Sequence, residues 1–344
     1  MPATFNRIFR LLCVAGLCCG FGVPASAGEK AKRANHYVFV NRDRERIKDS
    51  IVLRTKAFAG FQIKYTWREL EPAKDRYDFN AIRDDYSFLA LKGKRLFIQL
   101  QDSSFDDKIQ NVPEYLIREP QFNGGADRQY QVDEEKDERP LPAGWVARRW
   151  EATVQARYHK LLLELGKEFD GRIEGINLPE TAVDFGETGK LYPKGFTPEL
   201  YRNGIMTNLA ALKAAFPRSV TLQYANFMPG EWLPENDQNF LKSIFTRAKE
   251  IGVGLAGPDL LPNKPGQMKH SYPLIRGAAG IVPTGIAVQW GNYEHRDPRT
   301  GQQVTISELI AFAEEYLKVD YVFWSTQEPF FSGQLIPFLE NRTE

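Results

Sequence analysis

The sequence predicts an α/β fold, a single-domain (β/α)8 barrel, and three observations support this prediction. Eight apolar, strand-like runs recur along the chain, and amphipathic helix patterns separate most of them. No glycine-rich nucleotide-binding turn follows any of these runs, which argues against a doubly wound open sheet. After a leader of 27 residues, 317 of the 344 residues remain, enough for one barrel, which needs roughly 250.

The candidate strands are short runs rich in β-branched and aromatic residues. Two of these runs, 36–40 and 50–54, compete for the position of the opening strand. With the first of them, the eight candidates in chain order are 36–40, 60–66, 95–101, 172–178, 220–227, 252–257, 285–290 and 321–325. In such a barrel the functional residues lie at the C-terminal ends of the strands and in the loops that follow.

Helix patterns fall between these strands. Residues 148–169 repeat apolar side chains every three to four positions, which predicts an amphipathic helix. Residues 199–216 and 236–251 show a similar period. The pattern at 305–318 opens with Thr305, Ser307 and Glu308, a sequence that favours a capped helix start.

One connection is unusually long. About 45 residues, 103–147, separate the third strand from the helix at 148–169, and they are dense in charge, Gly and Pro without an apolar period. A loop of this length in a compact domain is typically a lid, a binding loop or disordered. We expect it to wall one side of a substrate cleft. No internal repeat or linker indicates a second domain within 28–344.

The first 27 residues are predicted to be a signal peptide. Arg7 and Arg10 precede an apolar run, and Ala25-Ser26-Ala27 gives the small-residue pattern of a cleavage site. Cleavage near Ala27 implies export to the periplasm or the exterior. The apolar run is too short for a membrane span, and no later stretch reaches about 20 apolar residues.

Composition excludes several other classes of function. The chain carries 45 basic and 44 acidic side chains, so net charge gives no case for nucleic acid or an anionic membrane. All three cysteines lie in the leader, which leaves no disulfide, zinc thiolate or cysteine nucleophile in the mature chain. The four histidines lack metal-site spacing. We therefore expect no metal, no cofactor and no membrane span, and nothing in the sequence implies a protein partner.

The region after the second strand carries a recognisable pattern. In order, it consists of Trp67, Glu71-Pro72, Tyr77-Asp78-Phe79 and Gly93-Lys94 ahead of the third strand, and then the segment 112–116. This order resembles the opening of many TIM-barrel glycoside hydrolases, the clan that holds β-galactosidases, xylanases and endoglucanases. The resemblance implies a barrel that hydrolyses glycosidic bonds with two carboxyl groups.

The segment 173–187 holds the candidate acid, Glu180. The helix before it ends in Asp170-Gly171, as in that clan, and the fourth strand ends in Asn177-Leu178-Pro179-Glu180. In the clan the acid/base glutamate usually follows an asparagine directly, so two residues are inserted here. The resemblance implies that Glu180 is the proton donor, a role that needs a carboxyl with a raised pKa in a partly apolar setting. The alternative is a loop carboxylate that only caps or pairs.

The second carboxylate stays open at this stage. Retaining members of the clan place a nucleophilic glutamate at the end of strand seven, where this sequence has Gln289 and Trp290. Three candidates remain: Asp259 after strand six, Glu294 after strand seven and Glu328 after strand eight. A partner outside strand seven favours inversion, in which the carboxyl groups lie roughly 6.5–9.5 Å apart, against about 5–5.5 Å for a retaining pair.

Ligand-binding candidates follow from aromatic and amide side chains at the strand ends. Flat rings stack on the apolar faces of pyranosides, and amides bond hydroxyl groups. A polar group at such a position, buried without a partner, costs a few kcal/mol, so an excess of amides suits an uncharged polyhydroxy ligand. The aromatic candidates are Trp67, Tyr224, Trp290, Tyr293 and Trp324, and the polar ones are Gln101, Asp102, Asn177, Gln223, Asn226 and Gln289. Trp145, Trp150 and Trp232 are expected to pack.

Together these patterns predict an exported glycoside hydrolase that cleaves an uncharged oligo- or polysaccharide by a two-carboxylate mechanism. The alternative is a secreted carbohydrate-binding protein on the same scaffold without catalysis. Gln289 in place of a nucleophile and the residues inserted before Glu180 favour this alternative.

Overall fold

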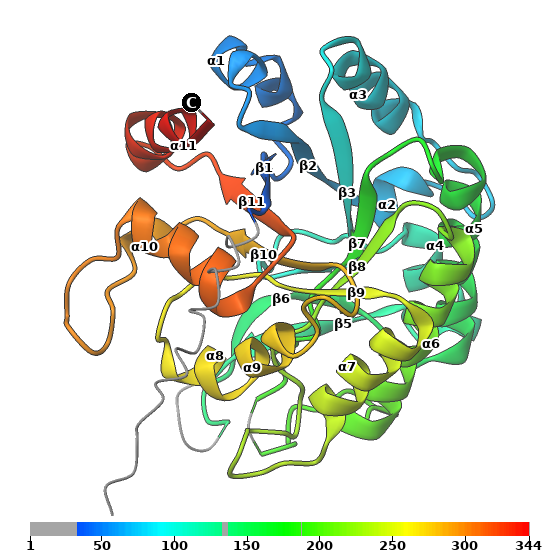
Figure 1. The fold of residues 1–344 in the computed structure, drawn as a ribbon. Coiled ribbons are helices and arrows are strands. Elements are labelled where there is room, and N and C mark those ends of the chain that lie inside the picture. The colour runs from blue at the N-terminus through cyan, green and yellow to red at the C-terminus, as the bar shows by residue number, and fades with distance from the viewer. Residues whose placement is uncertain (1–32, 133–136, 187, 344) are drawn as a thin grey trace, which may run out of the picture. The chain divides into compact units, whose positions relative to one another are not determined.

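Eight parallel strands close into a barrel, which confirms the predicted fold (Figure 1). The computed structural model describes residues 33–132, 137–186 and 188–343, so the leader predicted at 1–27 lies outside the described residues. In their order around the barrel the strands are β1 Asn35–Phe39, β11 Tyr321–Ser325, β10 Thr284–Val288, β9 Gly254–Gly257, β8 Val220–Tyr224, β7 Gly175–Leu178, β3 Arg95–Gln101 and β2 Phe58–Thr66. Each overlaps one of the eight candidate runs.

Alternation along the strands separates the barrel interior from the layer beneath the helices. On β2, Phe61, Ile63 and Tyr65 join the large core cluster, whereas Gln62 points inward and donates to the side chains of Asn177 (2.8 Å) and Tyr224 (2.9 Å). Towards the N-terminal ends the interior is filled by aromatic rings, with Phe97 and Phe323 packed edge to face at 5.0 Å. The interior therefore changes from aromatic to polar towards the C-terminal ends of the strands.

Helices surround the barrel (Figure 1). The run at 50–54 is a short helix, so β1 is the opening strand. The α-helices are α1 Ser50–Arg54, α2 Trp67–Leu70, α3 Asn80–Leu91, α4 Glu114–Arg118, α5 Ala152–Phe169, α6 Pro198–Ala215, α7 Phe240–Ile251, α8 Pro265–Lys269, α9 Ser271–Arg276, α10 Ile306–Ala311 and α11 Ile336–Thr343. Single 3-10 turns form η1 Arg44–Lys48, η2 Pro120–Phe122 and η3 Asn292–Glu294, and π-helical segments form η4 Phe312–Leu317 and η5 Phe331–Leu335.

Two helix starts show how local chemistry sets the boundaries. The pattern at 236–251 becomes helical only at Phe240, because the Glu231 carboxylate accepts from the backbone N–H groups of Phe240 (2.7 Å) and Leu241 (2.9 Å). The capped start at Thr305 is confirmed. Thr305 Oγ1 accepts from the N–H of Glu308, and the Glu308 carboxylate accepts from the N–H of Thr305, which is a capping box.

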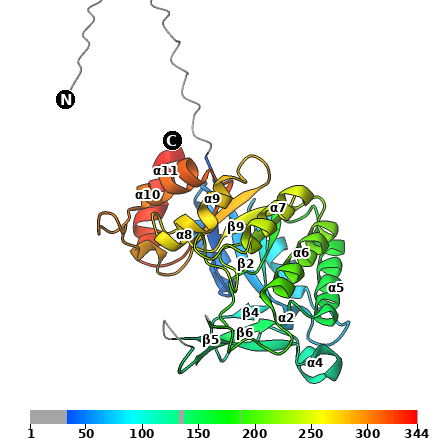
Figure 2. The same cartoon turned by 90° about the horizontal axis from the view of Figure 1, so that it is seen from below.

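The long connection at 103–147 is more ordered than the sequence indicates. Within it, β4 Ser103–Ser104, β5 Ala126–Gln131 and β6 Leu141–Ala147 form a small antiparallel sheet in the order β4-β6-β5 (Figure 2). Tyr130 N–H donates to Asp184 O (2.8 Å), and Asp184 N–H donates to the Gln129 side chain (2.8 Å). The small sheet is therefore attached to the loop that follows β7.

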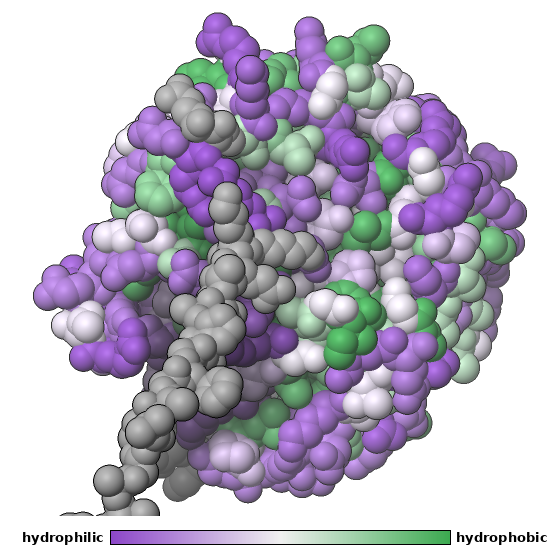
Figure 3. All heavy atoms as spheres, in the orientation of Figure 1, coloured by the Kyte–Doolittle hydropathy of each residue, from purple (hydrophilic) through white to green (hydrophobic). Residues whose placement is uncertain are grey.

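The face shown in Figure 3 is mainly hydrophilic, with apolar residues in small groups. Among the described residues, no helix has both the length and the apolar character needed to cross a membrane.

Candidate functional site

The main chain around Glu180 is immobilised by buried side chains. Pro179 follows the last residue of β7, and from there three consecutive carbonyl groups each accept a hydrogen bond. Gln223 donates to Pro179 O (2.6 Å), Arg149 to Glu180 O (2.8 Å) and Tyr201 to Thr181 O (3.0 Å). A segment that has left the sheet thus keeps its backbone satisfied and fixed, and Glu180 projects from a rigid base.

Arg149 is itself held by a buried ion pair. Its guanidinium contacts Asp102 through Nε (3.0 Å) and Nη2 (2.5 Å), and both side chains are almost fully buried. A bidentate contact of this kind fixes the orientation of both groups. The ion pair therefore links the end of β3 to the loop that carries Glu180. Asp102, expected to bind substrate hydroxyls, has this positioning contact instead.

The Glu180 carboxyl is partly buried and receives one oriented amide. Asn226 Nδ2 donates to Glu180 Oε2 at 2.7 Å. The amide is oriented by its other end, because Asn226 Oδ1 accepts from the backbone N–H of Ala182 (3.2 Å). Burial raises the pKa of Glu180, the Asn226 hydrogen bond lowers it, and the charge of Asp259 raises it. Together these effects bring the pKa to about 7. This is the pKa that a proton donor needs near neutral pH.

Asp259 lies in a matching arrangement after β9. Its Oδ1 accepts from Asn292 Nδ2 (3.1 Å), and Asn292 Oδ1 accepts from the backbone N–H groups of Gln289 (2.9 Å) and Leu260 (3.2 Å). Burial raises the pKa of Asp259 above its ordinary value, and the Asn292 hydrogen bond partly offsets this. Each carboxyl thus receives one asparagine whose amide orientation is set by main-chain donors.

The two carboxyls come from alternate strands of the barrel. β8 lies between β7 and β9, and side chains from alternate strands share a layer of a (β/α)8 barrel. The charge of Asp259 acts on Glu180, so Asp259 loses its proton first as the pH rises. Burial thus keeps a proton on Glu180 up to about pH 7, beside a second carboxyl group that titrates at lower pH. That is an acid and a base in one site.

The other two acids lie apart from this arrangement. Glu294 is exposed and accepts from the Gln327 side chain (2.9 Å). Glu328 is exposed and accepts from Ser332 Oγ (2.7 Å). The charge of Asp259 is among the main influences on the pKa of Glu180, and the charges of these two acids are not. Of the three candidates left open by the sequence, the structure favours Asp259.

For four of the five aromatic candidates the prediction is wrong, because their rings do not face a ligand site. Trp67 and Trp324 have no exposed surface, because both face the outer core, where Trp67 donates to Glu71 (2.9 Å) and Trp324 to His36 (3.0 Å). Tyr224 lies inside the barrel, hydrogen-bonded to Gln62, and Tyr293 is buried with its hydroxyl on Ser325 O (2.8 Å). Trp290, 71% exposed beside Gln289, keeps a ring available for a ligand.

A second exposed ring belongs to Trp232, which the sequence predicts to pack. Trp232 is 51% exposed and stacks on Phe227, with ring centroids 5.7 Å apart and planes 8° apart. Phe227 directly follows Asn226, the residue that bonds Glu180. The sequence offers a weak signal for this pair, since both rings lie in the loop after β8.

The amide candidates divide in the same way. Asn177 is fully buried and hydrogen-bonded to Gln62, and Gln223 is buried and donates to Pro179 O. Both were expected to face a ligand, and neither does. Asn226 bonds the candidate acid. Gln289 is partly buried at the end of β10. Gln101 is buried, and its Oε1 has no hydrogen-bond partner among the described residues. Asn292 and Arg149 were missed, because a long-range contact defines the role of each.

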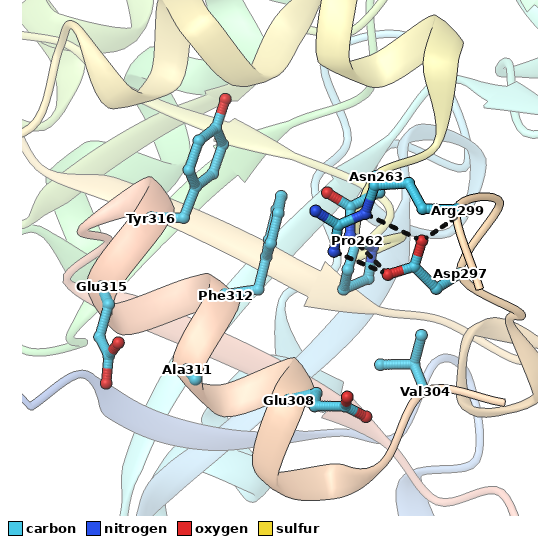
Figure 4. Close-up of a pocket in the computed structure, with 10 residues that line it drawn as sticks. All are labelled: Pro262, Asn263, Asp297, Arg299, Val304, Glu308, Ala311, Phe312, Glu315 and Tyr316. Atoms are coloured by element: carbon cyan, nitrogen blue, oxygen red, sulfur yellow. Dashed lines mark hydrogen bonds and ion pairs between the residues drawn. The ribbon is translucent and has the colours of Figure 1, made fainter. Parts of the chain in front are cut away.

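A cavity of about 250 Å³ lies elsewhere, between the loops after β9 and β10 and the helix from α10 into η4 (Figure 4). Asp297 bonds Arg299 and Asn263, and Glu308 belongs to the capping box, so these charged groups of the cavity already have partners. This cavity contains none of the residues around Glu180. No group of three or more metal-ligating side chains occurs among the described residues.

Comparisons with known proteins support the fold. No protein-family model and no curated protein sequence matches the chain. Among solved structures, the chain resembles a family 39 glycoside hydrolase from the gut symbiont Bacteroides cellulosilyticus WH2 (TM-score 0.52, 13% identity), covering 85% of this chain and 56% of that one. It also resembles the catalytic domain of a β-amylase from Paenibacillus polymyxa (TM-score 0.54, 9% identity), covering 86% of this chain and 93% of that one. Its structural neighbours are thus glycoside hydrolases on the same barrel fold, and the chain spans little more than half of the first.

Proposed function

We propose that this protein is a glycoside hydrolase in which Glu180 is the general acid and Asp259 is the second catalytic carboxylate. The observation that supports this most directly is the coupled pair itself. The two groups are partly buried just after two alternate strands, β7 and β9, and the charge of Asp259 raises the pKa of Glu180. Two carboxyls that titrate apart in one site supply the acid and the base or nucleophile that glycoside cleavage requires.

In the proposed reaction the Glu180 carboxyl protonates the glycosidic oxygen as the bond to the anomeric carbon breaks. The ionised Asp259 stabilises the positive charge that develops on the sugar. It then acts in one of two ways. Either it bonds to the anomeric carbon as the leaving group departs, and a water molecule that gives a proton to Glu180 then breaks this bond and frees the carboxylate, or it takes a proton from the water that attacks the anomeric carbon directly. Strands two positions apart in a barrel are separated by roughly 10 Å, which leaves space for a sugar between side chains that converge on the barrel axis.

The roles can be separated with aryl glycosides whose leaving groups differ in acidity. Glu180→Gln should cost about 10³-fold in kcat/KM on substrates with poor leaving groups, and much less on dinitrophenyl glycosides, which leave without a proton. Asp259→Asn should lose activity on both. Glu328→Gln, a change at an exposed carboxylate, is the matched control. Unchanged turnover in the Glu180 and Asp259 variants would contradict the proposal.

Proton NMR of the first product distinguishes the two courses. An anomer that keeps the substrate configuration indicates a covalent bond to Asp259, and the opposite anomer indicates attack by water. The export and the polyhydroxy sugar expected from the sequence belong to the same proposal. Fractionation of the culture with an antibody tests export. N-terminal sequencing of the exported protein should show a mature chain that begins near Gly28.

One observation favours the second candidate, a secreted carbohydrate-binding protein without catalysis. The end of β10, where the clan it resembles has a nucleophile, carries Gln289. Affinity electrophoresis in polysaccharide gels separates the two functions. Retardation of wild type and Glu180→Gln to the same extent, with no reducing ends released by either, would support the binding protein.

A further inference from the structure

An unpaired cation faces the candidate catalytic pair. Lys64 lies on β2, two residues beyond the inward-pointing Gln62, and therefore on the same inner face of the barrel. Its Nζ has no hydrogen-bond or ion-pair partner among the described residues, and it lies 5.7 Å from the centre of the Phe39 ring. β2 is separated from β7 by one strand, so Lys64 on β2 and the carboxyls just after β7 and β9 belong to successive alternate strands.

A second cation lies beside Lys64. Asn41 O accepts from the backbone N–H of Lys64 (2.8 Å), which places the loop after β1 against the end of β2. Arg42 from that loop lowers the pKa of Lys64 by its charge, after the larger effect of burial. The Arg42 guanidinium is exposed and held by Asn111 Oδ1 (2.5 Å). The barrel end thus has cations at β1 and β2 and carboxyls at β7 and β9.

Unpartnered acceptors complete this sector. In the register between β2 and β3, Lys64 is opposite Gln99, and Thr66 is opposite Gln101. Both glutamines are more than nine-tenths buried, and the Oε1 atom of each has no hydrogen-bond partner among the described residues. Buried acceptors without partners are costly, so their presence beside an unpaired lysine indicates a bound group that donates to them.

We propose that this sector binds an anionic sugar, an inference that rests on the proposed function. Lys64 and Arg42 would bind its carboxylate or sulfate, and Gln99 and Gln101 would accept from its hydroxyl groups. The charges of Lys64 and Glu180 act on each other, but the two groups form no ion pair between the described residues, so the ammonium is left without a contacting anion. The sequence favours an uncharged ligand on the strength of its amides. The amides remain suited to the hydroxyl groups, and the two cations add a charged substituent on the same sugar.

The test uses binding, so that it is independent of turnover. Calorimetry on Glu180→Gln compares short oligomers of galacturonate, glucuronate and mannuronate with their carboxyl-reduced neutral counterparts, and sulfated oligosaccharides with desulfated ones. We expect at least one anionic member to bind about tenfold more tightly than its neutral counterpart. The preference should weaken as salt is raised. The uronate and sulfate arms show which anion is bound.

Lys64→Met in the same background should abolish the preference, and Lys64→Arg should retain part of it. Lys56→Met is the matched control, because Lys56 is exposed before β2, at the opposite end of the strand. Equal affinity for charged and neutral members, no binding by any anionic member, or a preference that survives Lys64→Met would each overturn the inference. If anionic sugars bind to Lys64 but the wild type hydrolyses none of them, the glycosidase proposal fails and this one stands.

Discussion

Two asparagines set the environment of the two carboxyls at the scale of single residues. Asn226 and Asn292 each accept from main-chain N–H groups through Oδ1, and this leaves only Nδ2 to face a carboxyl. An amide that donates to a carboxylate stabilises the ionised form and lowers its pKa. Burial acts in the opposite direction and exceeds the effect of the amide at both sites.

A pair of substitutions should therefore move opposite limbs of the pH–rate profile. The proposed mechanism needs an ionised Asp259 and a protonated Glu180, so kcat/KM should fall at low pH and again above about pH 7. Asn226→Ala removes a donor to ionised Glu180, which raises its pKa and moves the alkaline limb up by about one unit. Asn292→Ala should move the acid limb up instead. Each variant controls for the other, and a shift of the same limb in both would contradict the assignment.

Glu180 is a candidate that both the sequence patterns and the geometry support, because its proposed role follows from position. Glu180 comes after a strand end, and the clan resemblance adds weight to that position. Trp324 shows why the same reasoning failed elsewhere. It shares strand parity with Val322, which faces the helices, so its ring points away from the barrel interior. Asn292 could not be assigned, because its role depends on main-chain donors and on an acid 33 residues away.

At the scale of elements, close packing of α6 against the segment before α5 supports the loop that carries Glu180. Gly204 on α6 lies so near the main chain that an added Cβ would be 2.0 Å from Arg149 O. Arg149 in turn binds Glu180 O. The absence of a side chain at Gly204 thus allows the approach of α6 to the residue that fixes the loop after β7.

Gly204→Ala should destabilise the fold by about 1–3 kcal/mol, since the main chain at Arg149 must move. It should also lower kcat more than it raises KM, because the acid is displaced. Chemical unfolding and steady-state kinetics measure the two effects. Gly333→Ala is the matched control: no atom lies within 4 Å of an added Cβ there, and alanine is the better helix former. Equal effects at both positions would contradict the role of Gly204.

The capping box at α10 gives a prediction about stability alone. Thr305→Ala removes the acceptor for Glu308 N–H and should lower the free energy of unfolding by about 1 kcal/mol. Thr246→Ala, at an exposed position inside α7, should be neutral or slightly stabilising, because threonine is the poorer helix former. Urea unfolding of the two variants distinguishes a cap from a general threonine effect.

Element prediction succeeded for strands and failed for insertions, for one physical reason. A buried parallel strand needs a continuous apolar run, and such a run is visible in any sequence. The small sheet in 103–147 has polar strands such as Ala126–Gln131, which pair with each other and with the β7 loop rather than burying an apolar face. Their order depends on partners distant in sequence, such as Asp184, so no local period reveals them.

For the whole molecule, the raised pKa of Glu180 lowers the free energy of unfolding at neutral and alkaline pH. The pKa of Glu180 rises from 4.5 to about 7 on folding, so between these values the folded state holds more protons than the unfolded chain. The free energy of unfolding therefore falls as the pH rises through this window. The full effect is present above pH 7 and amounts to about 3 kcal/mol at most.

Glu180→Gln should remove this effect, because the neutral amide has no charge to desolvate. We expect the variant to match the wild type near pH 4.5 and to exceed it by about 2–3 kcal/mol at pH 8, measured by urea unfolding at both values. Asp170→Asn is a control of opposite sign. Burial raises the pKa of Asp170, but hydrogen bonds from Arg218 and from the Ser219 N–H outweigh burial and lower it overall. Its loss should therefore destabilise the fold by similar amounts at pH 5 and pH 8. A Glu180→Gln variant less stable than wild type at pH 8 would mean that the carboxylate is well solvated, and the proton donor would have to be another group.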